Sequence, residues 1–552
     1  MMNSDNQRWW GWGTIDQSYD LTDRARFWPF LADELGLTGR ESVPVATLER
    51  LELPPSRLPD EDVTAVAEIV GREHLSAAPL KRLTHGVGKS YPDLMRLRLA
   101  ELERVPDLVV WPRSEEEVSA LLSLAVRCHW AIVPYGGGSS VTGGLAALGV
   151  LPTLSLDLAR LDQVLTVDPL SRTATIQAGI LGPALEQALN GEGLTLGHFP
   201  QSFEFSSLGG WIATRAAGQQ SLRYGKIEDM VEWLRVLTPQ GVIETRHVPA
   251  SAAGPSVKEA LVGSEGAYGV ITQATMRLRA LPSVRDYRGL LFRSYGDGVA
   301  AIRDMMQGER PPATARLSDV AETQAYQAMS RSTGGRTARL TRAIGARLMK
   351  RRGITLSGAC LMILGCEGDE HSVPEDMDAA LTACAAHGAF HLGRSPGEDW
   401  YSERFALPYL RDTLLDRGVM VDTLETATTW DNLLRLYEVV GQAIAAAIEV
   451  EGVKPLVLCH ISHAYSDGAS LYYTFLAKQV PDRQIAQWEY VKRRTTEAIM
   501  QHGGTLSHHH GVGVDHRPWL ENEHGPLGVA ALRGLKHTFD PYGVMNPGKL
   551  LD

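Results

Sequence analysis

The sequence predicts an α+β fold in which a two-part binding domain is followed by an α+β cap domain. Three observations carry this prediction. A chain of 552 residues exceeds the size at which one hydrophobic core keeps growing, so more than one domain is expected. Residues 107–136 fit a strand, a helix and a strand, and further strands follow them. Residues 283–500 mix long helical patterns with strand patterns.

The first domain is predicted to span residues 91–282. DLVVWP (107–112) predicts a buried strand, SEEEVSALLSLAVR (114–127) a helix capped by serine, and AIVPYG (131–136) a second strand. LPTLSLDL, VLTVDP and TATIQAGI predict more strands, which disfavours a Rossmann domain, where a helix would follow the glycine loop. The domain closes with GVITQATMRLRAL, whose alternation predicts an edge strand.

The other regions are assigned from composition and periodicity. Residues 1–90, with a Trp-rich start and the loop-like LELPPSRLPDED, are expected to be irregular and to wrap a larger body. In the cap, residues 283–500, TWDNLLRLYEVVGQAIAAAIEV predicts a helix, and KPLVLCHIS and SLYYTFLA predict strands. Residues 501–552 combine Gly/His-rich loops with a helix near 528–538, and we expect them to return to the binding site of the first domain.

Composition excludes several classes of protein. The net charge of −11 argues against nucleic acid as a partner. The five cysteines form no CxxC, so neither a disulfide framework nor a thiolate zinc site is indicated, and a reducing cytoplasm fits. The N-terminus lacks the pattern of an export signal, and the run GITLSGACLMILGC is shorter than a membrane crossing needs.

A glycine-rich loop, VPYGGGSSVTGG (133–144), follows the second predicted strand. Residues without Cβ can turn successive N–H groups toward one point and so form a cradle for an anion such as pyrophosphate. The alternative is a loop that serves chain geometry alone. QSFEFSSLGGWIATRAAG (201–218) and GSEGAYGVI (263–271) are also rich in backbone and hydroxyl donors. Three such loops favour one extended polar ligand.

These loops, with the terminal DPYGVMNPGKL, resemble the vanillyl-alcohol-oxidase/PCMH type of FAD-binding flavoproteins. Within that family RWWGWGTIDQ, ERVPDLVVWP, YLRD (409–412), ETATTWDNL and above all GGTLSHHHGVG (503–513) resemble the alkyldihydroxyacetonephosphate synthase branch, over nearly the whole chain. The resemblance implies a PCMH-type FAD-binding domain. Because the glycine loop holds no histidine, non-covalent FAD is expected, with His198 and the C-terminal histidines left open as attachment points.

By the same resemblance, four segments would hold FAD. Their residues are Pro134, Tyr135, Gly136, Gly137, Gly138, Ser139 and Ser140; Gln201, Ser202, Phe203, Glu204, Phe205, Ser206 and Ser207; Thr214, Arg215, Ala216 and Ala217; and Glu265, Gly266, Ala267, Tyr268, Gly269, Val270 and Ile271.

The implied reaction exchanges the acyl group of acyl-dihydroxyacetone phosphate for a long-chain fatty alcohol through a flavin N5 adduct. Tyr472 matches the family's acid/base tyrosine, Arg411 its substrate arginine, and Arg316 an arginine near the flavin. His508, His509 and His510 are expected to change charge near neutral pH and to complete the catalytic set.

Each of these residues has a plainer interpretation. Three adjacent histidines are often only solvated, and they cannot all point to one site. Tyr472 and Tyr473 face opposite sides of a strand, so one of them belongs to the core. Arg411 could pair with Asp412, and Arg316 with Asp319.

A rival from the same fold is an FAD-dependent oxidase or dehydrogenase of a D-2-hydroxyacid or an alcohol. Such enzymes use GHxGDGNxH and EHG patterns to bind a divalent metal. SHAYSDGASLY (462–472) keeps His463 but has Tyr472 where the second histidine would stand, and HHG has His509 in place of the acid. No metal site is therefore predicted, although His460, His463 and the triplet leave zinc or manganese open. A non-catalytic flavin- or lipid-binding protein is the third class.

The segment RTARLTRAIGARLMKRR (336–352) is basic in an otherwise acidic protein. Leu340, Ile344 and Leu348 would form one apolar stripe on a helix, which raises the hypothesis of peripheral contact with the inner face of an anionic membrane. The alternative is a solvated helix or loop. We otherwise expect a cytoplasmic enzyme, with a homodimer as the default assembly.

Overall fold

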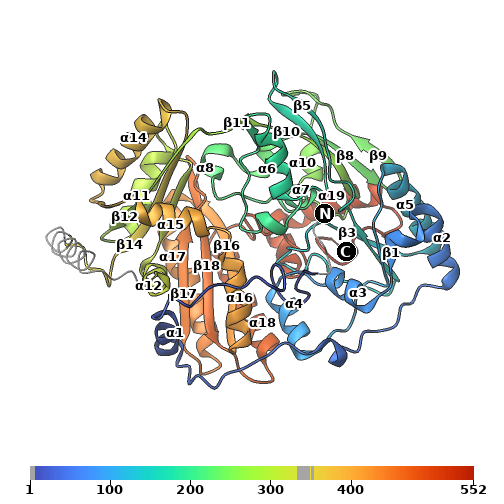
Figure 1. Cartoon of the computed structure of the whole chain (residues 1–552), viewed down its shortest axis with the longest axis horizontal. Helices are drawn as coiled ribbons and strands as arrows, with labels where there is room; N and C mark the ends of the chain where they lie inside the picture. Colours follow the sequence, from blue (N-terminus) through green and yellow to red (C-terminus); the bar gives the residue numbers. More distant parts are fainter. Residues whose placement is uncertain (1–5, 332–348, 350–352, 552) are drawn as a thin grey trace.

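The computed structural model describes residues 6–331, 349 and 353–551. It confirms the predicted α+β fold (Figure 1), with two sheets in the first domain and one large sheet in the cap. The basic segment 336–352 lies outside the described residues, except for Met349. Within the described part of the chain, no helix has both the length and the apolar composition that a membrane crossing requires.

The first domain is built on a four-stranded and a five-stranded sheet. In spatial order the first contains β1 (Leu75–Ser76), β2 (Leu108–Val110), β4 (Thr153–Asp157) and β3 (Ala131–Tyr135), of which β2, β4 and β3 run parallel. The second is antiparallel and contains β5 (Val164–Asp168), β6 (Thr173–Gln177), β10 (Val270–Arg277), β8 (Val231–Thr238) and β9 (Gly241–Glu244). A short pair, β7 (Leu194–Thr195) and β11 (Arg279–Ala280), lies beside them.

The prediction that GVITQATMRLRAL forms an edge strand is wrong. β10 is the central strand of the five-stranded sheet, between β6 and β8. Two of its polar side chains are buried with partners: the hydroxyl of Thr275 lies 2.9 Å from that of Thr175, and Thr272 donates to Glu115 at 2.6 Å. Alternating polarity therefore indicates internal hydrogen bonds here, not an exposed face.

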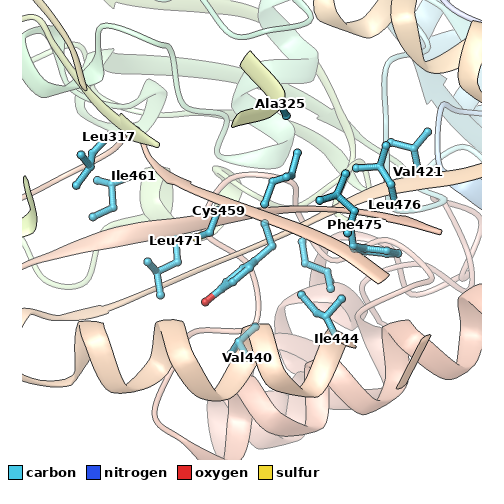
Figure 2. Close-up of a cluster of buried hydrophobic side chains, with 14 of the residues drawn as sticks. Leu317, Ala325, Val421, Val440, Ile444, Cys459, Ile461, Leu471, Phe475 and Leu476 are labelled. Atoms are coloured by element: carbon cyan, nitrogen blue, oxygen red, sulfur yellow. The ribbon is translucent and has the colours of Figure 1, made fainter. Parts of the chain in front are cut away.

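The cap is built on one seven-stranded antiparallel sheet. Its spatial order is β15 (Phe390–Gly393), β12 (Val284–Phe292), β14 (Cys360–Gly368), β13 (Thr314–Ser318), β17 (Pro455–Ile461), β18 (Gly468–Lys478) and β16 (Val419–Thr429). One face of its last three strands packs on α17 (Trp430–Glu449), the predicted cap helix. In Figure 2, Val440 and Ile444 of α17 lie on the side of Phe475, whereas Val421 and Leu476 lie on the other side of the strands.

The α-helices pack around these sheets, and some of them line the space between the two domains. They are α1 (Phe27–Leu35), α2 (Asp60–Val70), α3 (Pro79–Gly86), α4 (Tyr91–Leu99), α5 (Glu115–Cys128), α6 (Gly182–Asn190), α7 (Leu208–Thr214), α8 (Ser221–Tyr224), α9 (Ile227–Met230), α10 (Val257–Leu261), α11 (Tyr295–Met306), α12 (Val320–Met329), α14 (Ser372–Ala386), α15 (Ser395–Glu403), α16 (Leu407–Asp416), α17, α18 (Gln484–Gln501) and α19 (Leu520–Phe539). α5 starts at the predicted cap, where the Ser114 hydroxyl accepts the N–H of Glu117. α19 is longer than predicted and is interrupted at Gly525, just before Pro526.

The N-terminal region is more regular than predicted, because it contains α1, α2 and α3 joined by extended segments. Its chain runs across the cap to α1 and returns along the lower edge of the molecule to α2 (Figure 1). Arg24 pairs with Glu403 of the cap at 2.7 Å. β1 pairs with β2, so this region also contributes a strand to the first domain.

Candidate active site

A cavity of about 1590 Å³ is lined by residues of both domains and of the N- and C-terminal regions. The predicted FAD residues that line it are Pro134, Tyr135, Gly136, Gly137, Gly138, Ser139, Ser140, Gln201, Ser202, Ser207, Thr214, Ala216, Ala217, Glu265, Gly266, Gly269 and Ile271. The structure therefore brings residues from all four predicted segments to one place.

The other residues predicted for FAD do not line this cavity. Phe203, Phe205, Ala267, Tyr268 and Val270 are buried in the surrounding core. Glu204 accepts a hydrogen bond from Tyr409, Ser206 accepts one from Trp211 at 2.6 Å, and Arg215 donates to the backbone carbonyls of Glu259 and Val262. A continuous range over-predicts a site, because neighbouring residues in a helix or strand point in different directions.

The cavity face of the cap sheet changes from polar to apolar along the strands. Three rows of paired residues run across β17, β18 and β16: His460, Tyr472 and Glu425; then Leu458, Thr474 and Thr423; then Leu456, Leu476 and Val421. Except for Glu425, which is covered by the histidine loop, all of them line the cavity. The outer rows are about 13 Å apart at the usual rise of a strand.

Tyr472 and Tyr473 lie on opposite faces of β18. Tyr472 lines the cavity, with its ring 4.7 Å from that of His460 and 5.8 Å from that of His509, centre to centre. Burial raises the pKa of Tyr472 to about 12, so its phenol is a neutral proton donor at pH 7. Tyr473 is fully buried and donates to the carbonyl of Tyr437 at 2.9 Å.

The histidine loop, residues 507–510, is held by the buried carboxylate of Glu425. This carboxylate accepts the Ser507 hydroxyl at 2.9 Å and the backbone N–H groups of His508, His509 and His510 at 2.5, 3.2 and 2.9 Å. Burial opposes ionisation, but His510, His508 and these N–H donors outweigh it and lower the pKa of Glu425. One carboxylate of β16 therefore shapes the whole triplet.

The three histidines have different positions. His509 and His510 line the cavity, whereas His508 lies behind them, with Nδ1 2.9 Å from Nδ1 of His509 and Nε2 2.5 Å from the hydroxyl of Tyr465. If Tyr465 donates to His508, then His508 donates to His509 and fixes its tautomer. The prediction that one loop cannot point all three rings at one site agrees with this arrangement.

The expectation that the triplet changes charge near neutral pH is not met. Burial, as the main cause, lowers the pKa of His508, His509 and His510 below the usual imidazole value, while Glu425 opposes the shift at His508 and His510. The rings are neutral at pH 7 and can accept protons. Nitrogen atoms of His463, His508 and His509 lie within 4.8 Å of one another, so the metal alternative keeps a geometric basis.

Both arginines differ from their plainer interpretation. Arg316 lines the cavity and contacts Glu322 at 2.9 Å and Nδ1 of His460 at 3.0 Å, while Asp319 caps α12 instead. Burial opposes ionisation of Glu322, but Arg316 and His460 outweigh it and lower its pKa. This triad therefore contains a permanent ion pair.

Arg411 lines the cavity and pairs with Asp422 of β16 at 2.8 Å rather than with its neighbour Asp412. Asp412 instead accepts the backbone N–H of Trp12 at 2.8 Å and pairs with Arg8. The N-terminal region is thereby fixed to the wall of the site.

Two known protein families match successive parts of the chain. The FAD binding domain family matches residues 106–246, and the C-terminal domain of FAD linked oxidases matches residues 281–550. The alkyldihydroxyacetonephosphate synthase of Dictyostelium discoideum is 37% identical over 530 residues, covering 95% of this chain and 87% of the relative. The chain belongs to the alkyldihydroxyacetonephosphate synthase family.

The solved structures agree with this membership. A structure of alkyldihydroxyacetonephosphate synthase superposes with a TM-score of 0.85, at 33% identity and with 99% of both chains covered. p-Cresol methylhydroxylase superposes with a TM-score of 0.67 at 13% identity, which shows the shared fold alone. The predicted family, the PCMH-type fold and FAD as cofactor are thus confirmed.

The cavity of this family member fits FAD. A Cβ at Gly137 would lie 1.7 Å from the carbonyl oxygen of Phe205, and one at Gly136 would lie 2.1 Å from the hydroxyl of Ser207. The glycine loop can therefore lie against residues 205–207 only without side chains. In the described part of the chain, the N–H groups of Gly137 and Gly138 have no acceptor, which suits a pyrophosphate cradle.

Sequence reasoning missed Glu425 and Glu322. Glu425 stood in the quoted ETATTWDNL without an assigned role. The sequence signal for both would be a glutamate on a strand or helix that places it among other buried polar residues. That group of residues forms only when β16, β17 and α12 come together in the fold.

Proposed function

We propose that this chain exchanges the acyl group of acyl-dihydroxyacetone phosphate for a long-chain fatty alcohol and so forms an ether bond. The proposal rests on the change from polar to apolar side chains along the three rows of the cap sheet. It places Tyr472 at the polar end of one cavity and Leu456, Leu476 and Val421 at the other end. A substrate with a polar head and a long apolar chain matches this gradient.

The apolar end is extended by other elements. Phe27 and Leu31 of α1 and Leu414 of α16 also line the cavity. Leu414 stands on the same helix as Arg411, so α16 contributes both an apolar and a polar residue to the cavity lining. Burying alkyl carbons here stabilises binding by roughly 0.8 kcal/mol per CH₂.

The polar end supplies groups for proton transfer and anion binding. FAD, when bound, supplies the electron-rich centre at which the substituents are exchanged. Tyr472 is a neutral phenol that can donate a proton, and the neutral His509 and His510 can accept one. Arg411 would offer its guanidinium to the phosphate, and Arg316, which Glu322 holds beside His460, would lie near the flavin.

The test uses the FAD-loaded protein without oxygen. Palmitoyl-dihydroxyacetone phosphate and hexadecanol are supplied together, and mass spectrometry measures hexadecyl-dihydroxyacetone phosphate and palmitate, which should appear in equal amounts without net change in flavin absorbance. A parallel sample receives D-lactate or glycolate and an electron-accepting dye. Dye reduction without ether formation would replace the proposal by the oxidase or dehydrogenase alternative.

We also propose peripheral membrane contact through residues 336–352, which rests on their sequence alone. Flotation with anionic vesicles tests it. Binding that persists after Leu340, Ile344 and Leu348 are all changed to Ser would refute an apolar anchor. Sedimentation equilibrium on the same samples tests the expected homodimer.

A further inference from the structure

A lysine that the sequence did not single out lies beside the substrate arginine. Lys89 lines the cavity in the short connection between α3 and α4 and is half-buried. Its backbone N–H donates to the carbonyl of Ser140 at 2.6 Å, and its own carbonyl accepts a hydrogen bond from Arg411 at 2.6 Å. Its main chain is therefore fixed between the cofactor loop and Arg411.

The arginines around Lys89 have carboxylate partners. The pairs are Arg411 with Asp422 at 2.8 Å and Arg98 with Asp416 at 3.0 Å. Among the described residues, the ammonium of Lys89 has neither a hydrogen-bond acceptor nor a carboxylate at ion-pair distance. Lys89 thus contributes a positive charge to this part of the cavity that the protein itself does not neutralise by contact.

The charge of Lys89 persists at neutral pH. Burial lowers its pKa to about 8, while Asp412 and Asp93 act in the opposite direction. A partly desolvated ammonium without a contacting anion is unfavourable, and a bound anion relieves this cost.

We propose that Lys89 binds the phosphate of the substrate together with Arg411. This inference rests on the proposed function, because the phosphate of acyl-dihydroxyacetone phosphate is the anion invoked. A phosphate brings up to two negative charges and several acceptor oxygens, whereas Arg411 shares its own charge with Asp422. Lys89 supplies the net positive charge, and Arg411 supplies the planar donor geometry.

Glycerol 3-phosphate, which carries the phosphate but no acyl group, is the binding probe for the FAD-loaded protein. Calorimetry compares the wild type with Lys89→Met, which keeps the unbranched chain, Lys89→Arg, which keeps the charge, and Lys454→Met as a surface control. We expect Lys89→Met to weaken binding roughly tenfold to a hundredfold, and Lys89→Arg to recover most of it. The KM for hexadecanol should not change, whereas the KM for acyl-dihydroxyacetone phosphate should rise.

The outcomes separate the inference from the proposed function. Equal binding of glycerol 3-phosphate by wild type and Lys89→Met would overturn the role of Lys89 and leave the function standing. A wild type that binds neither glycerol 3-phosphate nor acyl-dihydroxyacetone phosphate would remove both. If Lys89→Met lost FAD absorbance while its flavin-loaded fraction bound glycerol 3-phosphate as well as the wild type does, Lys89 would be assigned to FAD binding instead. Weakened binding of palmitate alone would assign it to the departing carboxylate.

Discussion

The carboxylate of Glu425 accepts the backbone N–H of His510 at 2.9 Å, although the two residues are 85 positions apart in the chain. The carboxylate stands in the same row as Tyr472, so the strand that pairs with the tyrosine also shapes the histidine loop. The distance between Tyr472 and the imidazoles is thus set by a strand register, and a slip of one residue would move every side chain to the other face.

Changing Glu425 to Gln should disturb this arrangement. The amide of Gln turns a donor toward N–H groups that need an acceptor, so the loop shifts and kcat falls roughly a hundredfold, as expected for a misplacement near 1 Å. Glu367→Gln is a matched control, since Glu367 is equally buried in the cap and accepts hydrogen bonds from Tyr224 and Tyr287 away from the cavity lining. Steady-state kinetics and thermal unfolding measure both variants; equal loss of activity in the two would mean a structural effect only.

Tyr472 and Tyr473 offer a pair of identical substitutions on the two faces of one strand. Tyr472→Phe removes the proton donor in the cavity and should lower kcat by roughly 10²–10⁴-fold with little change in stability. Tyr473→Phe removes a buried hydrogen bond to Tyr437 and should cost about 1 kcal/mol of unfolding free energy while kcat stays near wild type. A reversal of these effects would mean that the acid/base group lies elsewhere.

Gly137→Ala should abolish FAD binding, because the added Cβ would collide with the Phe205 carbonyl. Gly534→Ala in α19 is the control, since a Cβ there meets nothing within 4 Å and alanine favours a helix. The flavin-to-protein absorbance ratio after purification measures both. If Gly137→Ala retained FAD, the loop would have to be more adaptable than its packing indicates.

His198 tests both cofactor attachment and pH dependence. Burial, reinforced by Lys226, lowers its pKa to about 3, and it does not line the cavity. The unfolded chain therefore binds one more proton than the folded protein between about pH 3 and 6.5, so stability falls as the pH decreases through this window. At pH 5 the penalty is about 2 kcal/mol.

His198→Phe should remove that loss of stability at low pH. The variant should still bind FAD, and denaturation should release this FAD. Denaturant unfolding at pH 5 and pH 7 measures the first effect, and flavin in the supernatant after acid precipitation measures the second. Flavin that stays with precipitated wild type but not with the variant would show covalent attachment at His198.

Treatment with a strong chelator should leave activity unchanged, because no metal site is predicted at the histidine cluster. Metal analysis of the purified protein should likewise show no stoichiometric zinc or manganese. If the chelator removed activity, zinc or manganese restored it, and the chelator had no such effect on His463→Ala, a metal site at His463, His508 and His509 would be favoured instead.

Much of the fold and part of the site could be predicted from local sequence. The serine cap at Ser114 and the helix at 430–449 follow from patterns within a few turns. The centre of the five-stranded sheet could not be recognised in this way, because the buried threonines of β10 resemble exposed ones until their partners on other strands are known.

The sequence by itself determined the residue types and local directions: three consecutive glycines without Cβ atoms at 136–138, and a period of two that separates Tyr472 from Tyr473. Only the tertiary structure decided which charges meet. Arg411 pairs with Asp422 instead of its neighbour Asp412, and it donates a hydrogen bond to the carbonyl of Lys89, 322 positions away. Electrostatic contacts depend on distance in space, and sheet pairing and domain packing bring such residues together regardless of their separation along the chain.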